Sequence, residues 1–170
     1  MIKATENRPA DDFPLPLTQI VSDLIKSGDE LSFEEWELRI VTRLRHKVDR
    51  YSWVGMYWVI GDYLYLGAWS GPEATEHVKI PVGDGICGLA ARTQETVIVD
   101  DVNARSDYLA CFPGTRSEIV VPILLNGHAI GEIDIDGDKA GAYSDEDREE
   151  LERLAAAISK RLQNGLIGDA

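Results

Sequence analysis

Cysteine is scarce in this chain of 170 residues, and its scarcity excludes one class of protein. Only two cysteines are present, Cys87 and Cys111, and neither has a CxxC partner. Two thiols cannot build the disulfide framework of a small secreted domain, and they are typical of a reducing compartment. We therefore expect a cytoplasmic protein.

Long apolar runs and positive charge are also in short supply. No stretch approaches the roughly 18 apolar residues of a membrane span, and the opening MIKATENRPADDF lacks the apolar segment of an export signal. The 17 Lys and Arg are outnumbered by 30 Asp and Glu, which gives a formal net charge of −13. Because such a chain repels phosphate backbones and anionic lipids, we expect neither nucleic acid nor membrane as a partner.

Helical periodicity occurs mainly at the two ends of the chain. Apolar residues recur at helical spacing within residues 15–48, which predicts two helices, and Ser32 with Glu35 forms a capping box before the second. Residues 144–163 predict a C-terminal helix. Residues 1–13 are polar, and we expect a flexible N-terminus there.

Residues 51–136 are rich in β-branched and aromatic side chains and in turn residues, which predicts a sheet with pocket loops. Asn126–Gly127 is a strong two-residue turn, and residues 85–93 predict a short helix. Because no βαβ alternation is present, we expect one α+β domain over residues 1–170, with a central antiparallel sheet of about six strands and the N- and C-terminal helices packed on one face.

Carboxylates recur along one predicted strand. The period of two puts Glu132, Asp134 and Asp136 on one face, whereas Ile133 and Ile135 between them face the core. This acidic face is either a solvated surface or a cluster that binds an ammonium group and donates a proton.

The partner strand across the Asn126–Gly127 turn adds Glu118 at its far end, where the side chain could approach Asp134 or Asp136. A metal site is not predicted, because the acidic spacing does not fit an EF-hand loop and the three histidines are scattered.

The two cysteines stand in different contexts. Cys111 lies in a loop rich in turn formers, where it is either a reactive thiol or a small buried hydrophobe. Cys87 has apolar neighbours in the short predicted helix, so burial fits it better.

Aromatic residues alternate along the first predicted strand, where Trp53, Gly55 and Tyr57 share a face. They form either a slot that is open at Gly55 or ordinary sheet core.

Taken in order, these segments resemble a GAF domain, and within that superfamily the free methionine-(R)-sulfoxide reductases. The resemblance spans about Tyr51 to Asp136 and includes the 24-residue spacing between the cysteines. Its motifs are W-x-G-x-Y at Trp53–Tyr57, G-x-G-[VI]-C-G at Gly83–Gly88, D-V at Asp101–Val102, A-C at Ala110–Cys111, S-E-I-V-V-P-I at Ser117–Ile123 and G-x-I-D-I-D at Gly131–Asp136.

This resemblance implies a function and a set of site residues. Cys111 would be the nucleophile that reduces free L-methionine-(R)-sulfoxide, and it would be left as a sulfenic acid. Of the other site residues, Glu118 would act as a catalytic acid and, together with Asp134 and Asp136, hold the substrate, while Trp53 and Tyr57 would wall in its thioether end. No bound cofactor is implied, and an external thiol such as thioredoxin would supply electrons.

The chain departs from the family pattern at two places, the resolving cysteine and a loop that carries some substrate contacts in the family. The family commonly has a resolving cysteine ten residues before the G-[VI]-C-G cysteine, and His77 stands there in this chain. The family loop P-G-H-x-A-C-D is replaced by residues 106–112. Recycling then passes either through a disulfide between Cys111 and Cys87 as resolving thiol, or through an external thiol.

An alternative to the enzyme is a non-catalytic GAF domain that senses a small ligand, since a fold alone does not settle function. With either function, the amphipathic terminal helices could pair with a second copy, so we expect a homodimer.

Overall fold

The computed structural model describes residues 14–106, 108 and 112–168, so the predicted flexible N-terminus at 1–13 lies outside the described residues. The elements, in chain order, are α1 (Leu17–Ser27), α2 (Phe33–Lys47), β1 (Trp53–Ile60), β2 (Tyr63–Ser70), β3 (Lys79–Pro81), α3 (Gly85–Thr93), β4 (Val97–Val99), the 3₁₀ helix η2 (Val102–Ala104), β5 (Ser117–Leu125), β6 (His128–Gly137) and α4 (Asp145–Gly168).

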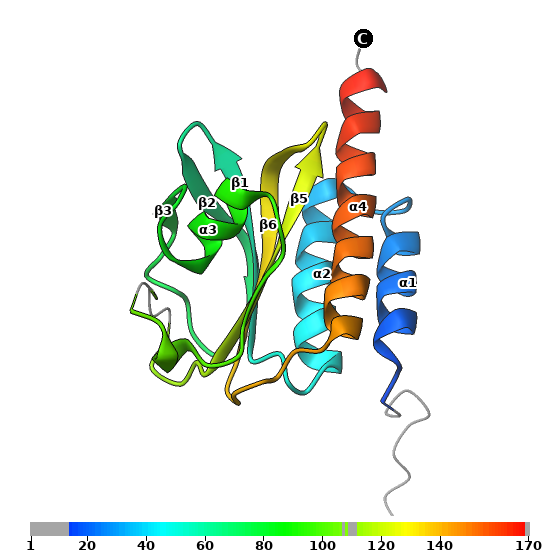
Figure 1. The fold of residues 1–170 in the computed structure, drawn as a ribbon. Coiled ribbons are helices and arrows are strands. Elements are labelled where there is room, and N and C mark those ends of the chain that lie inside the picture. The colour runs from blue at the N-terminus through cyan, green and yellow to red at the C-terminus, as the bar shows by residue number, and fades with distance from the viewer. Residues whose placement is uncertain (1–13, 107, 109–111, 169–170) are drawn as a thin grey trace, which may run out of the picture.

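The six strands form one antiparallel sheet in the order β3-β2-β1-β6-β5-β4. Helices α2 and α4 cover one face, α1 packs against both of them, and α3 lies on the opposite face (Figure 1). The predicted α+β class, the antiparallel sheet and the packing of the terminal helices on one face are therefore confirmed.

The face under α2 and α4 holds the main hydrophobic core. Side chains at alternate positions of the central strands point into it, including Ile133 and Ile135 of β6 as the period of two predicted. The apolar stripes of the helices complete this core, with Ile20, Trp36 and Leu154 among the fully buried members.

The opposite face of the sheet carries a smaller apolar cluster that α3 covers. Trp53 and Tyr57 of β1 belong to it, together with Cys87 and Ala90 of α3. The odd and even positions of β1 thus serve two different cores, and this second one surrounds the candidate site.

Local sequence signals set the main turns and helix starts. Asn126 and Gly127 both have positive φ, at 52° and 77°, as the two-residue hairpin turn between β5 and β6 requires. The capping box of Ser32 and Glu35 is present at the start of α2, as predicted.

The start of α4 is tied to the segment just before β1 by a buried carboxylate. Asp147 exchanges hydrogen bonds with the backbone and hydroxyl of Ser144, and it also accepts hydrogen bonds from Arg50 and from the Tyr51 hydroxyl. Burial opposes ionisation, but these hydrogen bonds outweigh it and lower the pKa of Asp147. The cap therefore also joins the last helix to the sheet.

The apolar faces of the terminal helices are used within the chain, so they no longer argue for pairing with a second copy. The homodimer stays a prediction without that support. Within the described residues, no helix has the length and apolar character that crossing a membrane requires.

We expect Asp147→Asn to lower the free energy of unfolding at pH 7 by about 2 kcal/mol, because Arg50 and Tyr51 lose a charged acceptor. Since the folded-state pKa of Asp147 is depressed, this contribution is present above the unfolded value and is lost as pH falls below about 4. Urea unfolding of the parent and the variant at pH 7 and below pH 4 measures this difference in the free energy of unfolding. Glu149→Gln, an exposed acid of the same helix, is the control, and an equal effect of both substitutions would contradict the account.

Candidate active site

Four carboxyl groups gather on the sheet face that α3 covers. Three come from alternate positions of β6, namely Glu132, Asp134 and Asp136, and the register pairs Asp136 with Glu118 at the start of β5. The predicted approach of Glu118 to the end of β6 is therefore confirmed. We call these four residues the carboxylate row.

The carboxylate row is buried. Its side chains are 0–3% exposed, so the solvated-face interpretation of the sequence is wrong. No hydrogen bond of standard geometry joins the carboxylate oxygens of Glu132, Asp134 and Asp136 to a residue that the structure describes. The Cys87 thiol, the Glu118 carboxyl and the Thr115 hydroxyl lie near enough only to moderate the rise of their pKa values. Buried polar groups normally have partners, so three unpartnered carboxyls in succession indicate a site that a polar ligand completes.

Burial also changes the protonation of the row. It raises the pKa of Asp134 to about 7, and it raises the pKa of Glu118 well above its ordinary value, with the charges of Asp134 and Asp136 adding to the effect. The pKa values of Glu132 and Asp136 are raised by burial and by the charge of Asp134. At neutral pH the row therefore holds protons that it can donate.

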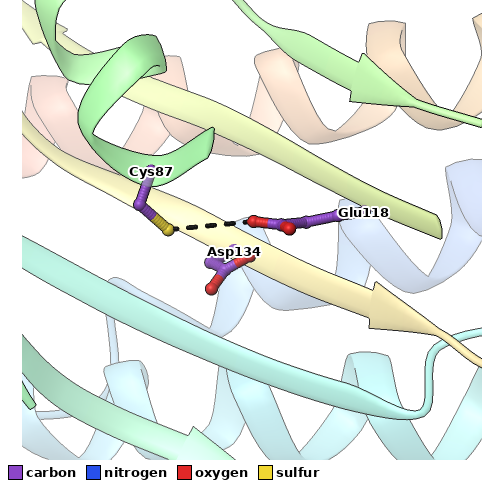
Figure 2. A group of neighbouring side chains, drawn as sticks. All are labelled: Cys87, Glu118 and Asp134. Carbon is purple, nitrogen blue, oxygen red and sulfur yellow. Dashed lines mark hydrogen bonds between the residues drawn. The ribbon is translucent and has the colours of Figure 1, made fainter. Parts of the chain in front are cut away.

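Cys87 faces the carboxylate row from the opposite side of the site. The short helix α3 carries its side chain over the sheet, and the thiol Sγ lies 4.0 Å from Oε1 of Glu118. Figure 2 shows Cys87, Glu118 and Asp134 pointing toward one another from α3, β5 and β6. Cys87 is 4% exposed, which fits the buried position expected from its apolar neighbours.

Trp53 closes the gap at Gly55 that the sequence left open. A Cβ at Gly55 would lie 2.2 Å from Cη2 of Trp53, so the indole occupies the space above the glycine. The aromatic face is therefore filled by its own tryptophan and is not an open slot. Trp53 is 2% exposed, and its Nε1 has no hydrogen-bond partner among the described residues.

A pocket of about 280 Å³ lies beside Trp53 at the outer end of the carboxylate row. Trp53, Phe112, Thr115 and Asp136 line it, and the rings of Trp53 and Phe112 are 5.7 Å apart between centroids. The lining of the pocket thus combines aromatic rings with a carboxyl group and a hydroxyl group.

The remaining predicted site residues lie deeper or outside the description. Tyr57 is fully buried and donates a hydrogen bond from its hydroxyl to the carbonyl of His77, at 2.9 Å. Cys111 lies outside the described residues.

The structure adds two residues to the site that the sequence did not single out, Trp69 and Thr115. Trp69 stacks on Trp53, with ring centroids 6.3 Å apart. The pairing of Trp69 with Gly55 across β1 and β2 is a tertiary signal that no motif carries.

The profile of the GAF domain family matches residues 32–163. The chain therefore belongs to the GAF domain family, as its six-stranded sheet and flanking helices indicate.

Within this family, the chain is similar to free methionine-R-sulfoxide reductases, which confirms the resemblance seen in the sequence. The reductase of Escherichia coli K12 is 37% identical over 111 residues, which cover 65% of this chain and 66% of the relative, slightly less than two thirds of its length.

Two solved reductases extend the comparison. The type II enzyme of Thermoplasma acidophilum is 39% identical, with a TM-score of 0.73 over 84% of this chain and 96% of that one. The enzyme of Neisseria meningitidis, solved with its substrate, is 31% identical, with a TM-score of 0.81 over 86% and 88%.

We expect Asp134→Asn to stabilise the fold at pH 8 by about 2–4 kcal/mol. Because the folded-state pKa of Asp134 is raised to about 7, the folded form resists the ionisation that the unfolded chain undergoes near pH 4. The parent therefore loses stability as pH rises through this range, and the variant does not.

Urea unfolding of both proteins at pH 5 and pH 8 measures this difference, which should shrink at the lower pH. Asp138 is an exposed aspartate just after the same strand. Its substitution Asp138→Asn is the control and should leave the free energy of unfolding unchanged at both pH values. A variant that is no more stable than the parent at pH 8 would contradict the burial argument.

Proposed function

We propose that this chain reduces free L-methionine-(R)-sulfoxide to methionine, with Cys111 as the nucleophile. The observation that carries the proposal is a buried carboxylate row with unpartnered oxygens, beside an aromatic pocket that Phe112, the residue after Cys111, helps to line. The similarity to reductases of this substrate supports the same assignment.

The carboxylate row suits the amino group of a free amino acid. Asp136 lines the pocket and Asp134 lies two residues further along the same face of β6. An ammonium group entering this site would meet acceptors that have no other hydrogen-bond donor, and its charge would favour their ionised form. A residue within a peptide has no such group, so the row would select the free amino acid.

The sulfoxide end would lie against the aromatic wall. In the proposed complex, Trp53 Nε1 is a buried donor without a partner and would donate a hydrogen bond to the sulfoxide oxygen. Tyr57 would support this wall from behind, since its hydroxyl is held by the carbonyl of His77.

The proposed reaction transfers oxygen from the substrate sulfur to the cysteine. Protonation of the sulfoxide oxygen by Glu118, whose raised pKa keeps a proton available, makes the substrate sulfur an electrophile that the Cys111 thiolate attacks. The attack forms a bond between Sγ of Cys111 and the substrate sulfur, and the sulfur–oxygen bond breaks to release hydroxide. Hydroxide then attacks Sγ, the sulfur–sulfur bond breaks with its electron pair on the departing methionine, and Cys111 is left as a sulfenic acid. Cys111 is oxidised by two electrons and the substrate sulfur is reduced by two.

Recycling of Cys111 would draw on an external thiol, for which a thioredoxin-like protein is the expected donor in a reducing cytoplasm. In the alternative route, Cys87 is the resolving thiol and forms an intermediate disulfide with Cys111. A cytoplasmic location, which the scarcity of cysteine suggests, is part of this proposal. Dimerisation is part of it too, without support from the terminal helices, whose apolar faces lie in the main core.

A single turnover without reductant tests the proposed nucleophile. We expect the parent to form one methionine per protein chain, Cys111→Ser to form none, and Cys87→Ser to form one, because the sulfenic acid arises on Cys111 before any resolving step. Chromatography of methionine against protein concentration gives the stoichiometry.

Added dithiothreitol then reports on recycling, and retention of multiple turnovers by Cys87→Ser would show that an external thiol suffices. Equal methionine formation by Cys111→Ser would overturn the nucleophile. A parent that binds the sulfoxide and forms no methionine would place the chain among ligand-sensing GAF domains.

We expect Trp53→Phe to lower kcat/KM by roughly tenfold, because phenylalanine keeps an aromatic wall but loses the Nε1 donor. Trp58→Phe is the matched control, since Trp58 packs against the main core on the other face of the sheet and the same substitution should leave kcat/KM within about twofold. Steady-state kinetics on the free sulfoxide gives both values. If Trp53→Phe kept the parent's kcat/KM, the proposed hydrogen bond from Trp53 Nε1 to the sulfoxide oxygen would be wrong.

A further inference from the structure

Three ligand-type atoms converge where α3 crosses the carboxylate row. The Cys87 thiol, a Glu118 carboxylate oxygen and an Asp134 carboxylate oxygen all lie within 4.8 Å of one another. All three residues are buried, and they come from a helix and two neighbouring strands (Figure 2). Each side chain is therefore held by regular structure and not by a loop.

The buried carboxylate of Asp134 is a second, separate indication that a ligand binds to these three side chains. Asp134 is 0% exposed, and neither of its carboxylate oxygens makes a hydrogen bond of standard geometry to a described residue. Glu132 and Asp136, on either side of it along the same face, are unpartnered in the same way. A buried carboxylate without a partner is costly, and a coordinated cation would satisfy it.

The donor set determines which cation would fit. A thiolate with two carboxylates is a borderline-soft combination that suits Zn²⁺ or Co²⁺, whereas Mg²⁺ and Ca²⁺ prefer oxygen ligands alone. Tetrahedral zinc places neighbouring ligand atoms about 3.5 Å apart, so rotation of the side chains by a small amount would close the observed spacing. Three protein ligands leave a fourth position for water.

We propose that Cys87, Glu118 and Asp134 form a binding site for a divalent transition-metal cation of the Zn²⁺ type, and that the cation and the sulfoxide substrate exclude one another. The exclusion follows because both need the carboxylates of Glu118 and Asp134. This second part rests on the proposed function, whereas the metal site itself does not.

No sequence pattern predicts the proposed metal site, because Cys87 and Glu118 are 31 positions apart and lie on separate elements. The predicted absence of a metal site considered histidines and EF-hand spacing, and neither bears on ligands that the fold brings together. A bound cation would convert the reductase into an inactive form without any change in the fold.

Cobalt binding to the reduced, metal-free protein tests the site, because a thiolate on Co²⁺ gives a near-ultraviolet charge-transfer band. We expect this band in the parent and also in Cys111→Ser, the matched control that keeps Cys87. Cys87→Ser should lose the band. Asp134→Asn should weaken Co²⁺ binding by tenfold or more, whereas Asp138→Asn should not.

No band in the parent would overturn the site, and so would a band that survives in Cys87→Ser but disappears in Cys111→Ser. Circular dichroism checks that each variant is folded. If Cys87→Ser does not fold, the isosteric Asp134→Asn tests the metal site in its place. Undiminished Co²⁺ affinity in that variant would also overturn the site.

The exclusion is tested on cobalt-loaded Cys111→Ser, which cannot consume substrate under the proposed mechanism. Free methionine-(R)-sulfoxide should bleach the band as it displaces the ion, and a band that is unchanged at saturating sulfoxide would overturn the exclusion. Because the cobalt band is read without turnover, failure of the reductase proposal and failure of the metal site give different results.

Discussion

The burial of the carboxylate row is the constraint on which the rest of this structure depends. Four acidic side chains from two adjacent strands lie under α3 with 0–3% exposure, and three of them have no hydrogen-bond partner among the described residues. Such an arrangement costs folding free energy, and it persists only where other parts of the protein supply the difference. Its presence is therefore the strongest physical sign of function in the chain.

The opposite face of the sheet supplies that difference. Ile133 and Ile135 alternate with the acids of β6, so the same strand that carries the site also anchors it in the main core. Asp147 adds a buried, fully hydrogen-bonded carboxylate that fastens α4 to the segment just before β1. The contrast is informative: this carboxylate is satisfied and has a lowered pKa, whereas the row is unsatisfied and has raised pKa values.

Much of the fold could be predicted because its signals are local. The period of two on β6, the Asn126–Gly127 turn and the Ser32–Glu35 capping box each act over a few residues, and the turn sets the register that brings Glu118 to Asp136. The burial of the row could not be predicted, since the helix that covers it lies far away in sequence. The filling of Gly55 by Trp53 escaped prediction for a related reason: the rotamer of a tryptophan depends on its stacking partner Trp69 on another strand.

We propose that the buried carboxylates hold the ammonium group of a free amino acid. Comparing the reduction of L-methionine-(R)-sulfoxide with that of its N-acetyl derivative, at equal reductant, tests it most directly, because acetylation removes the positive charge of the amino group and leaves the sulfoxide end unchanged. The account predicts that kcat/KM for the acetylated compound falls by a hundredfold or more, since a charge-assisted contact worth about 3 kcal/mol is lost. Equal values for the two compounds would contradict it and would leave the carboxylate row without its proposed ligand.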